Sequence, residues 1–162
     1  MGQLGVSALL AAVFVALAPA PIGAEETGAA QAATCIAERI AQGRAPNDCV
    51  DARHAICTGL SRQTPAVAVV CFRTAEQEWS QASRAILDRL QAEAPEEITA
   101  IAGIELKYDL LSGRLQCDRI EELAIAVSDH GSEAIARQKA RCQATAAGLA
   151  HVRLAWRARP GT

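Results

Sequence analysis

Cysteine and histidine are the residue types in this chain that are best suited to carry chemistry. The sequence has six cysteines and three histidines: Cys35, Cys49, Cys57, Cys71, Cys117 and Cys142, with His54, His130 and His151. Both types bind zinc, and a CxxC pair is typical of metal and redox sites. The sequence contains no CxxC pair, no CxxCH haem motif and no histidines at zinc-ligand spacing. We therefore expect no metal, no cofactor and no redox-active cysteine.

The common motifs of hydrolases are absent as well. There is no GxSxG nucleophile motif and no HExxH metal motif. His130 lies in a polar segment, and His54 and His151 lie on expected helices, where we place them at the solvent edge. The large aromatic residues fall on helical stripes and are expected in the core: Trp79, Tyr108 and Trp156. These patterns predict a protein that is not an enzyme and has no catalytic residues.

The N-terminus predicts export. Residues 4–17 form an apolar run of 14 residues, too short to span a membrane but typical of a signal peptide. Cleavage after Ala24 would leave Glu25 as the first residue, although no Lys or Arg precedes the run. An even number of cysteines in an exported chain predicts three disulfides. We expect a signal peptide at 1–24, a flexible lead at 25–33, and a periplasmic or secreted product without membrane attachment after cleavage.

The composition favours helices. Alanine supplies 36 of the 162 residues, whereas aromatic residues make up only 3%. Strands prefer β-branched and aromatic side chains, so this balance argues against a β-sandwich or barrel. A formal net charge of −2 argues against nucleic acid as a partner, which requires a basic surface. The chain is long enough for one domain, which we place at 34–158 as an all-α fold.

Helix start and stop signals divide that domain into about five helices. Thr34, Asp48 and Thr64 are N-cap residue types, and Pro65 suits the first position of a helix. Pro95 then breaks a long helical pattern. The expected helices are 35–42, 49–61, 65–94, 96–127 and a last one that follows the loop 128–132, with Ser132 as a cap, and ends near 157. Apolar residues at steps of three and four predict that one stripe of each long helix faces a shared core. In 96–127 this stripe is Ile101, Ile104, Tyr108, Leu111, Leu115, Ile120, Leu123 and Val127.

The turns between these helices suggest how the cysteines pair. In an antiparallel pair of helices, residues at equal distances from the turn lie side by side. Three sequential cysteine pairs bracket a turn in this way, with midpoints at Gln42, at Thr64 and in the loop 128–132. The expected disulfides are Cys35–Cys49, Cys57–Cys71 and Cys117–Cys142. Crossed pairing of Cys35 with Cys57 and of Cys49 with Cys71 stays open. The prediction is a disulfide-stapled bundle of successive antiparallel hairpins.

The same cysteines carry a family resemblance. Residues 35–79, from CIAERI to AEQEW, resemble the front of the LprI-type lysozyme-inhibitor family of small secreted bacterial proteins. In that family a run of cysteines leads into a helix with a Glu and a Trp, which here correspond to Glu76 or Glu78 and to Trp79. The C-terminal half of the chain also resembles the family. A long helix ends at Cys117, a loop that contains glycine follows, and Cys142 comes after it. The resemblance covers residues 35–154 and implies a secreted helical scaffold whose partner is a lysozyme.

Acidic residues gather where a basic partner could dock. Glu93, Glu96 and Glu97 surround the corner at Pro95, and we take them as the candidate partner surface. Lysozymes are generally basic, so an acidic patch would steer their encounter. The alternative is that these acids belong to solvated helix faces, where neighbouring Arg and Lys pair with them. We expect a binding module, a lysozyme inhibitor by resemblance. The other possibility is a periplasmic structural or envelope-stress protein that does not contact lysozyme.

Overall fold

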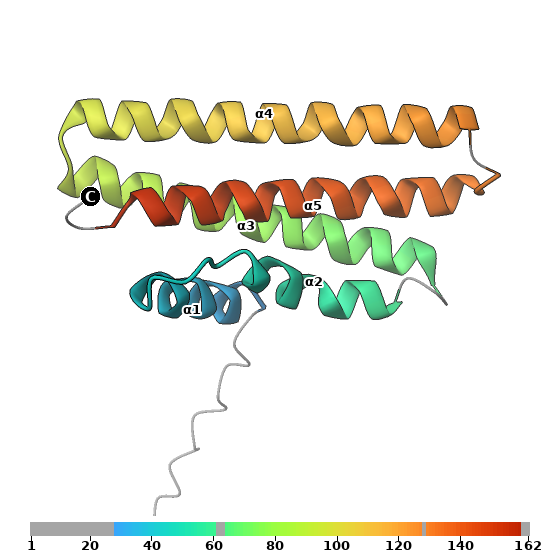
Figure 1. Cartoon of the computed structure of the whole chain (residues 1–162), viewed down its shortest axis with the longest axis horizontal. Helices are drawn as coiled ribbons and strands as arrows, with labels where there is room; N and C mark the ends of the chain where they lie inside the picture. The colour runs from blue at the N-terminus through green and yellow to red at the C-terminus, as the bar shows by residue number, and fades with distance from the viewer. Residues whose placement is uncertain (1–27, 61–63, 128, 160–162) are drawn as a thin grey trace, which may run out of the picture.

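The computed structural model describes residues 28–60, 64–127 and 129–159. These residues form five α-helices and no strand (Figure 1). The helices are α1 (Gly28–Ala41), α2 (Asp48–Leu60), α3 (Pro65–Glu93), α4 (Glu96–Val127) and α5 (Ser132–Arg157). The all-α prediction is therefore confirmed. The predicted signal peptide at 1–24 and residues 25–27 lie outside the described residues.

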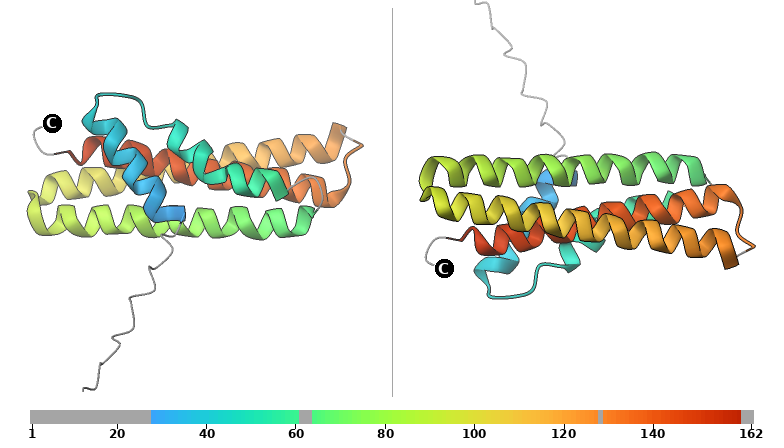
Figure 2. Two further views of the ribbon diagram at one scale, coloured as in Figure 1. Left: turned by 90° about the horizontal axis from the view of Figure 1, so that it is seen from below. Right: turned by 90° about the horizontal axis from the view of Figure 1, so that it is seen from above.

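Three long helices and one short hairpin make up the molecule. Helix α5 runs between α4 and α3 and packs most extensively on these two helices (Figures 1 and 2). The short helices α1 and α2 form a second layer against α3 and α5, on the side away from α4. Within the described ranges, α4 contacts α5 and α3 but neither α1 nor α2. Helix α4 is thus the outer element on the side opposite to α1 and α2. None of the described helices is long and apolar enough to cross a membrane.

Each disulfide joins two consecutive helices across their turn. The structure pairs Cys35 with Cys49, Cys57 with Cys71 and Cys117 with Cys142, as the positions of the turns predict. The Cα atoms of the three pairs lie 5.9, 5.5 and 5.6 Å apart. The crossed pairing is excluded. These bonds tie α1 to α2, α2 to α3 and α4 to α5.

The helix boundaries differ from the predicted ones mainly at the N-terminus. Helix α1 begins at Gly28, so residues 28–33, which we predicted as part of a flexible lead, are helical. Their alanines have the highest helix propensity, and the buried Ala32 packs in the core with Ile36. Thr64 is the N-cap of α3 as predicted, but its hydroxyl donates to the Leu60 carbonyl and caps nothing. For α5 the N-cap is Gly131, and Ser132 is already the first helical residue.

Helix α4 is rotated away from the orientation that its apolar stripe predicts. Every member of the predicted core stripe of α4 is exposed, with Tyr108 at 65% and Leu115 at 50%. The buried residues of α4 are instead Ala102, Leu106 and Cys117. A helix turns by about 100° per residue, so Cys117, nine positions after Tyr108, lies half a turn around α4. Because the disulfide to Cys142 points Cys117 at α5, Tyr108 must point away from it.

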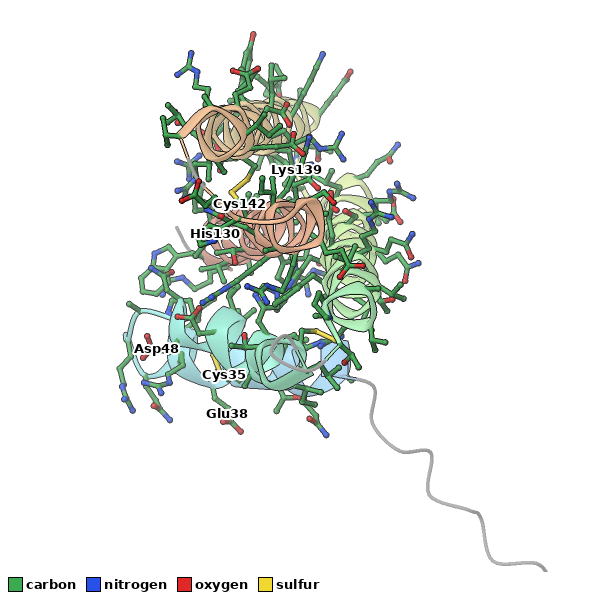
Figure 3. All side chains as sticks on the ribbon, turned by 90° about the vertical axis from the view of Figure 1, so that its right-hand side faces the viewer. Cys35, Glu38, Asp48, His130, Lys139 and Cys142 are labelled. Atoms are coloured by element: carbon green, nitrogen blue, oxygen red, sulfur yellow. A yellow bond between two sulfur atoms is a disulfide. The ribbon has the colours of Figure 1, made fainter. Side chains whose placement is uncertain are left out.

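A face of small residues completes this packing. A Cβ atom built on Gly113 would lie 2.6 Å from the Cβ of Ala146, so α4 and α5 approach closely only because residue 113 is glycine. Lys139 of α5 adds ion pairs with Asp118 at 3.0 Å and Glu121 at 2.5 Å of α4. Figure 3 shows Lys139 and Cys142 on α5 below the ribbon of α4, and other side chains that project from α4 on the side away from α5. The outer stripe of α4 is left without a partner element in this part of the chain.

Candidate functional site

The predicted partner residues meet at one corner of the bundle. Glu93 ends α3, and Glu96 and Glu97 occupy the first turn of α4, with Pro95 between them. We call these three residues the acidic corner. All three side chains are exposed, and carboxylates in the first turn of α4 are stabilised by the helix dipole. The turn itself is fixed because the Ala94 N–H donates to the Leu90 carbonyl.

The acidic corner takes no part in the ion pairs that join the helices in the middle of the bundle. Asp118 and Glu121 bind Lys139, Glu76 binds Arg114 at 3.4 Å, and Glu78 binds Arg53 at 2.5 Å. Among the described residues, the ion pairs of the structure include none of Glu93, Glu96 and Glu97. The paired acids of the middle of the bundle bind basic residues of other helices and not neighbours on their own helix, and the exposed acidic corner fits both a partner surface and a solvated helix face.

An apolar hollow adjoins the acidic corner. Its volume is about 210 Å³, and its lining residues come from α3, α4 and the end of α5: Leu90, Ile98, Ile101, Ala102, Glu105, Leu154, Arg157 and Ala158. Ile98 follows Glu97 directly, and Leu90 lies one turn before Glu93. Arg157 at the rim forms an ion pair with Glu105. This end of the molecule therefore offers a small apolar depression with unpaired carboxylates beside it.

A buried polar cluster is the main feature that sequence reasoning missed. His54 of α2 and His151 of α5 are 3% and 4% exposed, so our placement of both at the solvent edge is wrong. Both rings contact the buried Trp79 indole, at centroid distances of 6.4 and 5.4 Å. The Trp79 Nε1–H donates to His54 Nε2 at 3.2 Å. The Ser83 hydroxyl donates to the Trp79 carbonyl at 2.9 Å and lies 3.2 Å from His151 Nδ1. We call these four residues the histidine cluster.

Burial sets the charge of these histidines. It lowers the pKa of His151 to about 4. The pKa of His54 is also lowered to about 4, mainly by burial and then by the nearby positive charge of Arg53, with Asp51 opposing. Both rings are therefore neutral at pH 7. A neutral imidazole has one acceptor nitrogen, which His54 uses for the Trp79 indole.

The histidine cluster lies in the interior of the bundle and holds three helices together. Ser83 and His151 form a hydroxyl–imidazole pair, but the Ser83 hydroxyl donates its proton to the Trp79 carbonyl and not to the imidazole, as a serine nucleophile would. Ser83 is only 3% exposed, so a substrate has no access to its oxygen in this conformation. In the described part of the chain, no group of three or more His, Cys, Asp or Glu side chains is arranged to hold a metal ion. His130 is exposed, as predicted.

The Glu and Trp of the family resemblance have structural roles here. Glu78 and Trp79 on α3 meet Arg53 and His54 on α2, as two adjacent pairs of residues. Arg53 Nε donates to the Glu78 carboxylate at 2.9 Å, and both side chains are largely shielded from water. This double contact holds the short hairpin on the long helices. Glu76, the other candidate for the family's glutamate, binds Arg114 of α4.

Comparison with known proteins does not add a family. No protein family, no curated protein and no solved structure matches this chain. The acidic corner, the histidine cluster and the exposed apolar stripe of α4 are the features that bear on function.

Proposed function

We propose that this protein is an exported binding module that acts by protein–protein contact and has no enzymatic activity. The acidic corner is the observation that carries this proposal. Three exposed carboxylates that are free of the ion pairs seen elsewhere in the bundle attract a basic partner from a distance. The neighbouring apolar hollow gives such a partner a place to bury a side chain.

A lysozyme is the partner that the family resemblance suggests. Lysozymes are basic, and a rigid helical corner held by nearby long helices is suited to contact an enzyme surface without reorganising. The test measures lysozyme activity on peptidoglycan with and without the purified protein, at several salt concentrations. We expect inhibition that weakens as salt rises, because salt screens the attraction between the acidic corner and the enzyme.

Matched charge variants locate the contact. Replacing the acidic corner with E93Q, E96Q and E97Q together should weaken inhibition by about 10-fold or more. The control E122Q, D129N and E133Q removes the same number of exposed charges at the far end of α4. Equal loss of inhibition in both variants would show a general charge effect and reject the acidic corner. No inhibition by the unaltered protein would reject lysozyme and favour a structural role in the cell envelope.

Export is the second part of the proposal. Three disulfides suit an oxidising compartment, where such bonds form and persist. The intact mass of the protein recovered from the periplasm or the medium should match residues 25–162 less six hydrogens. Recovery from the cytoplasm with free thiols would contradict this part.

A further inference from the structure

We propose that the outer face of α4 binds a second copy of this chain and forms an antiparallel homodimer. The outer face consists of Ile101, Ile104, Tyr108, Leu111 and Leu115, which are all about half exposed or more. These residues lie directly opposite the buried residues of α4. Burying such a row of large apolar side chains is favourable, and monomers rarely expose one this continuous.

The spacing of the outer face matches a helix–helix seam. Its steps are three, four, three and four residues, which is the heptad pattern that keeps apolar side chains facing a partner helix. The inner face of α4 has no such pattern and uses small residues and a disulfide instead. The outer face is therefore a second packing surface on the same helix.

The pattern is also nearly symmetric about its centre, which favours two identical helices. Ile101 and Leu115 each lie seven residues from Tyr108, and Ile104 and Leu111 lie four and three residues from it. A two-fold axis at Tyr108 would place Ile101 against Leu115 and Ile104 against Leu111 of the second copy. An isologous contact of this kind requires that a surface be complementary to itself.

Charges at the two ends of the outer face favour the antiparallel arrangement. Glu97 precedes the seam and Arg119 follows it, and both are exposed. An antiparallel dimer sets Glu97 opposite Arg119 of the second copy at both ends. A parallel dimer sets Glu97 against Glu97 and Arg119 against Arg119, which is unfavourable. Opposed helix dipoles also favour the antiparallel alignment.

The expected dimer is reversible. From Glu97 to Arg119 the seam extends about 33 Å at about 1.5 Å per residue, and one helix over that length buries less than the about 800 Å² per partner of a standard interface. Lys107 flanks the seam near the proposed axis, where it faces the same residue of the second copy. Both facts predict an association in the micromolar range.

Sedimentation velocity on the oxidised protein from about 1 to about 200 μM tests the proposal. We expect the mass to rise from monomer towards dimer across this range. Tyr108→Glu and Leu111→Glu should each weaken the association by about 10-fold or more, because each buries a charge in the seam. The control Ile56→Glu changes an exposed apolar residue of α2 and should leave the association unchanged. Circular dichroism checks that each variant is folded.

Charge reversal tests the orientation. Glu97→Arg or Arg119→Glu alone should weaken the dimer, and the two together should restore it. A monomer at all concentrations, or a dimer insensitive to Tyr108→Glu, overturns the proposal. A monomer that instead binds phosphatidylglycerol vesicles through Tyr108 and Leu111 would assign the outer face to a lipid surface and also overturns it. Glu97 and Ile101 belong to both surfaces, so Glu97→Arg changes the dimer seam and the acidic corner together. Tyr108 and Leu111 lie outside the acidic corner and the hollow, so their variants test the dimer without changing the proposed partner surface.

Discussion

His54 and His151 hold the Trp79 ring between α2 and α5 at the cost of making the fold sensitive to acid. Their pKa values, lowered to about 4 in the folded chain, return to about 6.5 when it unfolds. Between these values the unfolded state binds more protons, so stability falls as pH falls from 6.5 to 4. The loss is on the order of 3 kcal/mol for each histidine.

Urea unfolding at several pH values between 7.5 and 4.5 measures this loss, and His130→Gln serves as control. His130 is exposed, so its removal should leave the pH dependence unchanged. Replacing His151 with Gln should remove about half of the pH dependence, although it also lowers stability at pH 7. If stability were constant from pH 7.5 to 4.5, the two histidines would have to be solvated in the folded protein, which contradicts their burial in the structure.

Gly148 provides a second prediction for a single residue. A Cβ atom at this position would lie 2.6 Å from Val50 Cγ1 and 3.1 Å from the Trp79 ring, and both neighbours are buried. Gly148→Ala should therefore destabilise the protein by about 1–3 kcal/mol through overpacking. Gly103 is also inside a helix but has nothing within 4 Å of its Cβ position. Gly103→Ala should stabilise by about 0.5–1 kcal/mol, and thermal unfolding of both variants compares them. A stabilised Gly148→Ala variant would contradict the close packing at Trp79.

The burial of both histidines was within reach of the sequence. His54 lies four residues after Val50 and three before Cys57, and all three are on the buried face of α2. His151 lies four residues after Ala147 and three before Leu154 on the buried face of α5. The polarity of the imidazole led us to place both at the solvent edge. Their actual partner, Trp79, comes from a third helix, and no local pattern reveals that contact.

At the scale of the elements, α4 shows which of two sequence signals determines the orientation of a helix when the two disagree. The apolar stripe and Cys117 lie on opposite faces of this helix, so they could not both face α5. A covalent bond fixes orientation more strongly than a row of apolar residues, because its geometry tolerates Cα distances of only about 4.4–6.8 Å. The positions of the turns predict the cysteine pairing, and this pairing combined with helical geometry predicts an exposed apolar stripe on α4. Helix number, order and most boundaries followed directly from the positions of proline and glycine, although neither Thr64 nor Ser132 caps a helix with its side chain.

Removing the bond between α4 and α5 is the prediction for this element. The sequence separation of Cys117 and Cys142 is 25 residues, and closing such a loop constrains the unfolded chain by about 3 kcal/mol. Cys117→Ser with Cys142→Ser should lower the free energy of unfolding by about that amount. Helix content should remain, since α5 keeps its buried contacts with α3 through Ala140 and Ala144. Chemical denaturation followed by circular dichroism gives both quantities. Loss of helical signal under native conditions would mean that the bond, and not packing, maintains the bundle.

At the scale of the whole molecule, the two layers differ in how they are held. The long helices pack along much of their length, with α5 in contact with α3 and α4. Helices α1 and α2 have 14 and 13 residues, a length at which isolated helices are marginal in water. Their attachment depends on two disulfides, on the Arg53–Glu78 ion pair and on the contact of Val50 and Cys49 with the Trp79 region.

We therefore predict that the short layer opens before the long one, and that the disulfides set the order. Without the Cys35–Cys49 bond, amide hydrogen exchange should quicken in α1 and remain slow in α3, α4 and α5. Without the Cys57–Cys71 bond, exchange should quicken in both α1 and α2, because that bond joins their hairpin to α3. Paired Cys→Ser variants followed by exchange and mass spectrometry resolve the helices separately. Faster exchange spread evenly over all five helices would show a single cooperative unit. An ordered opening is expected because α1 reaches the bundle mainly through α2 and the Trp79 region, whereas α5 is enclosed by neighbours on several sides.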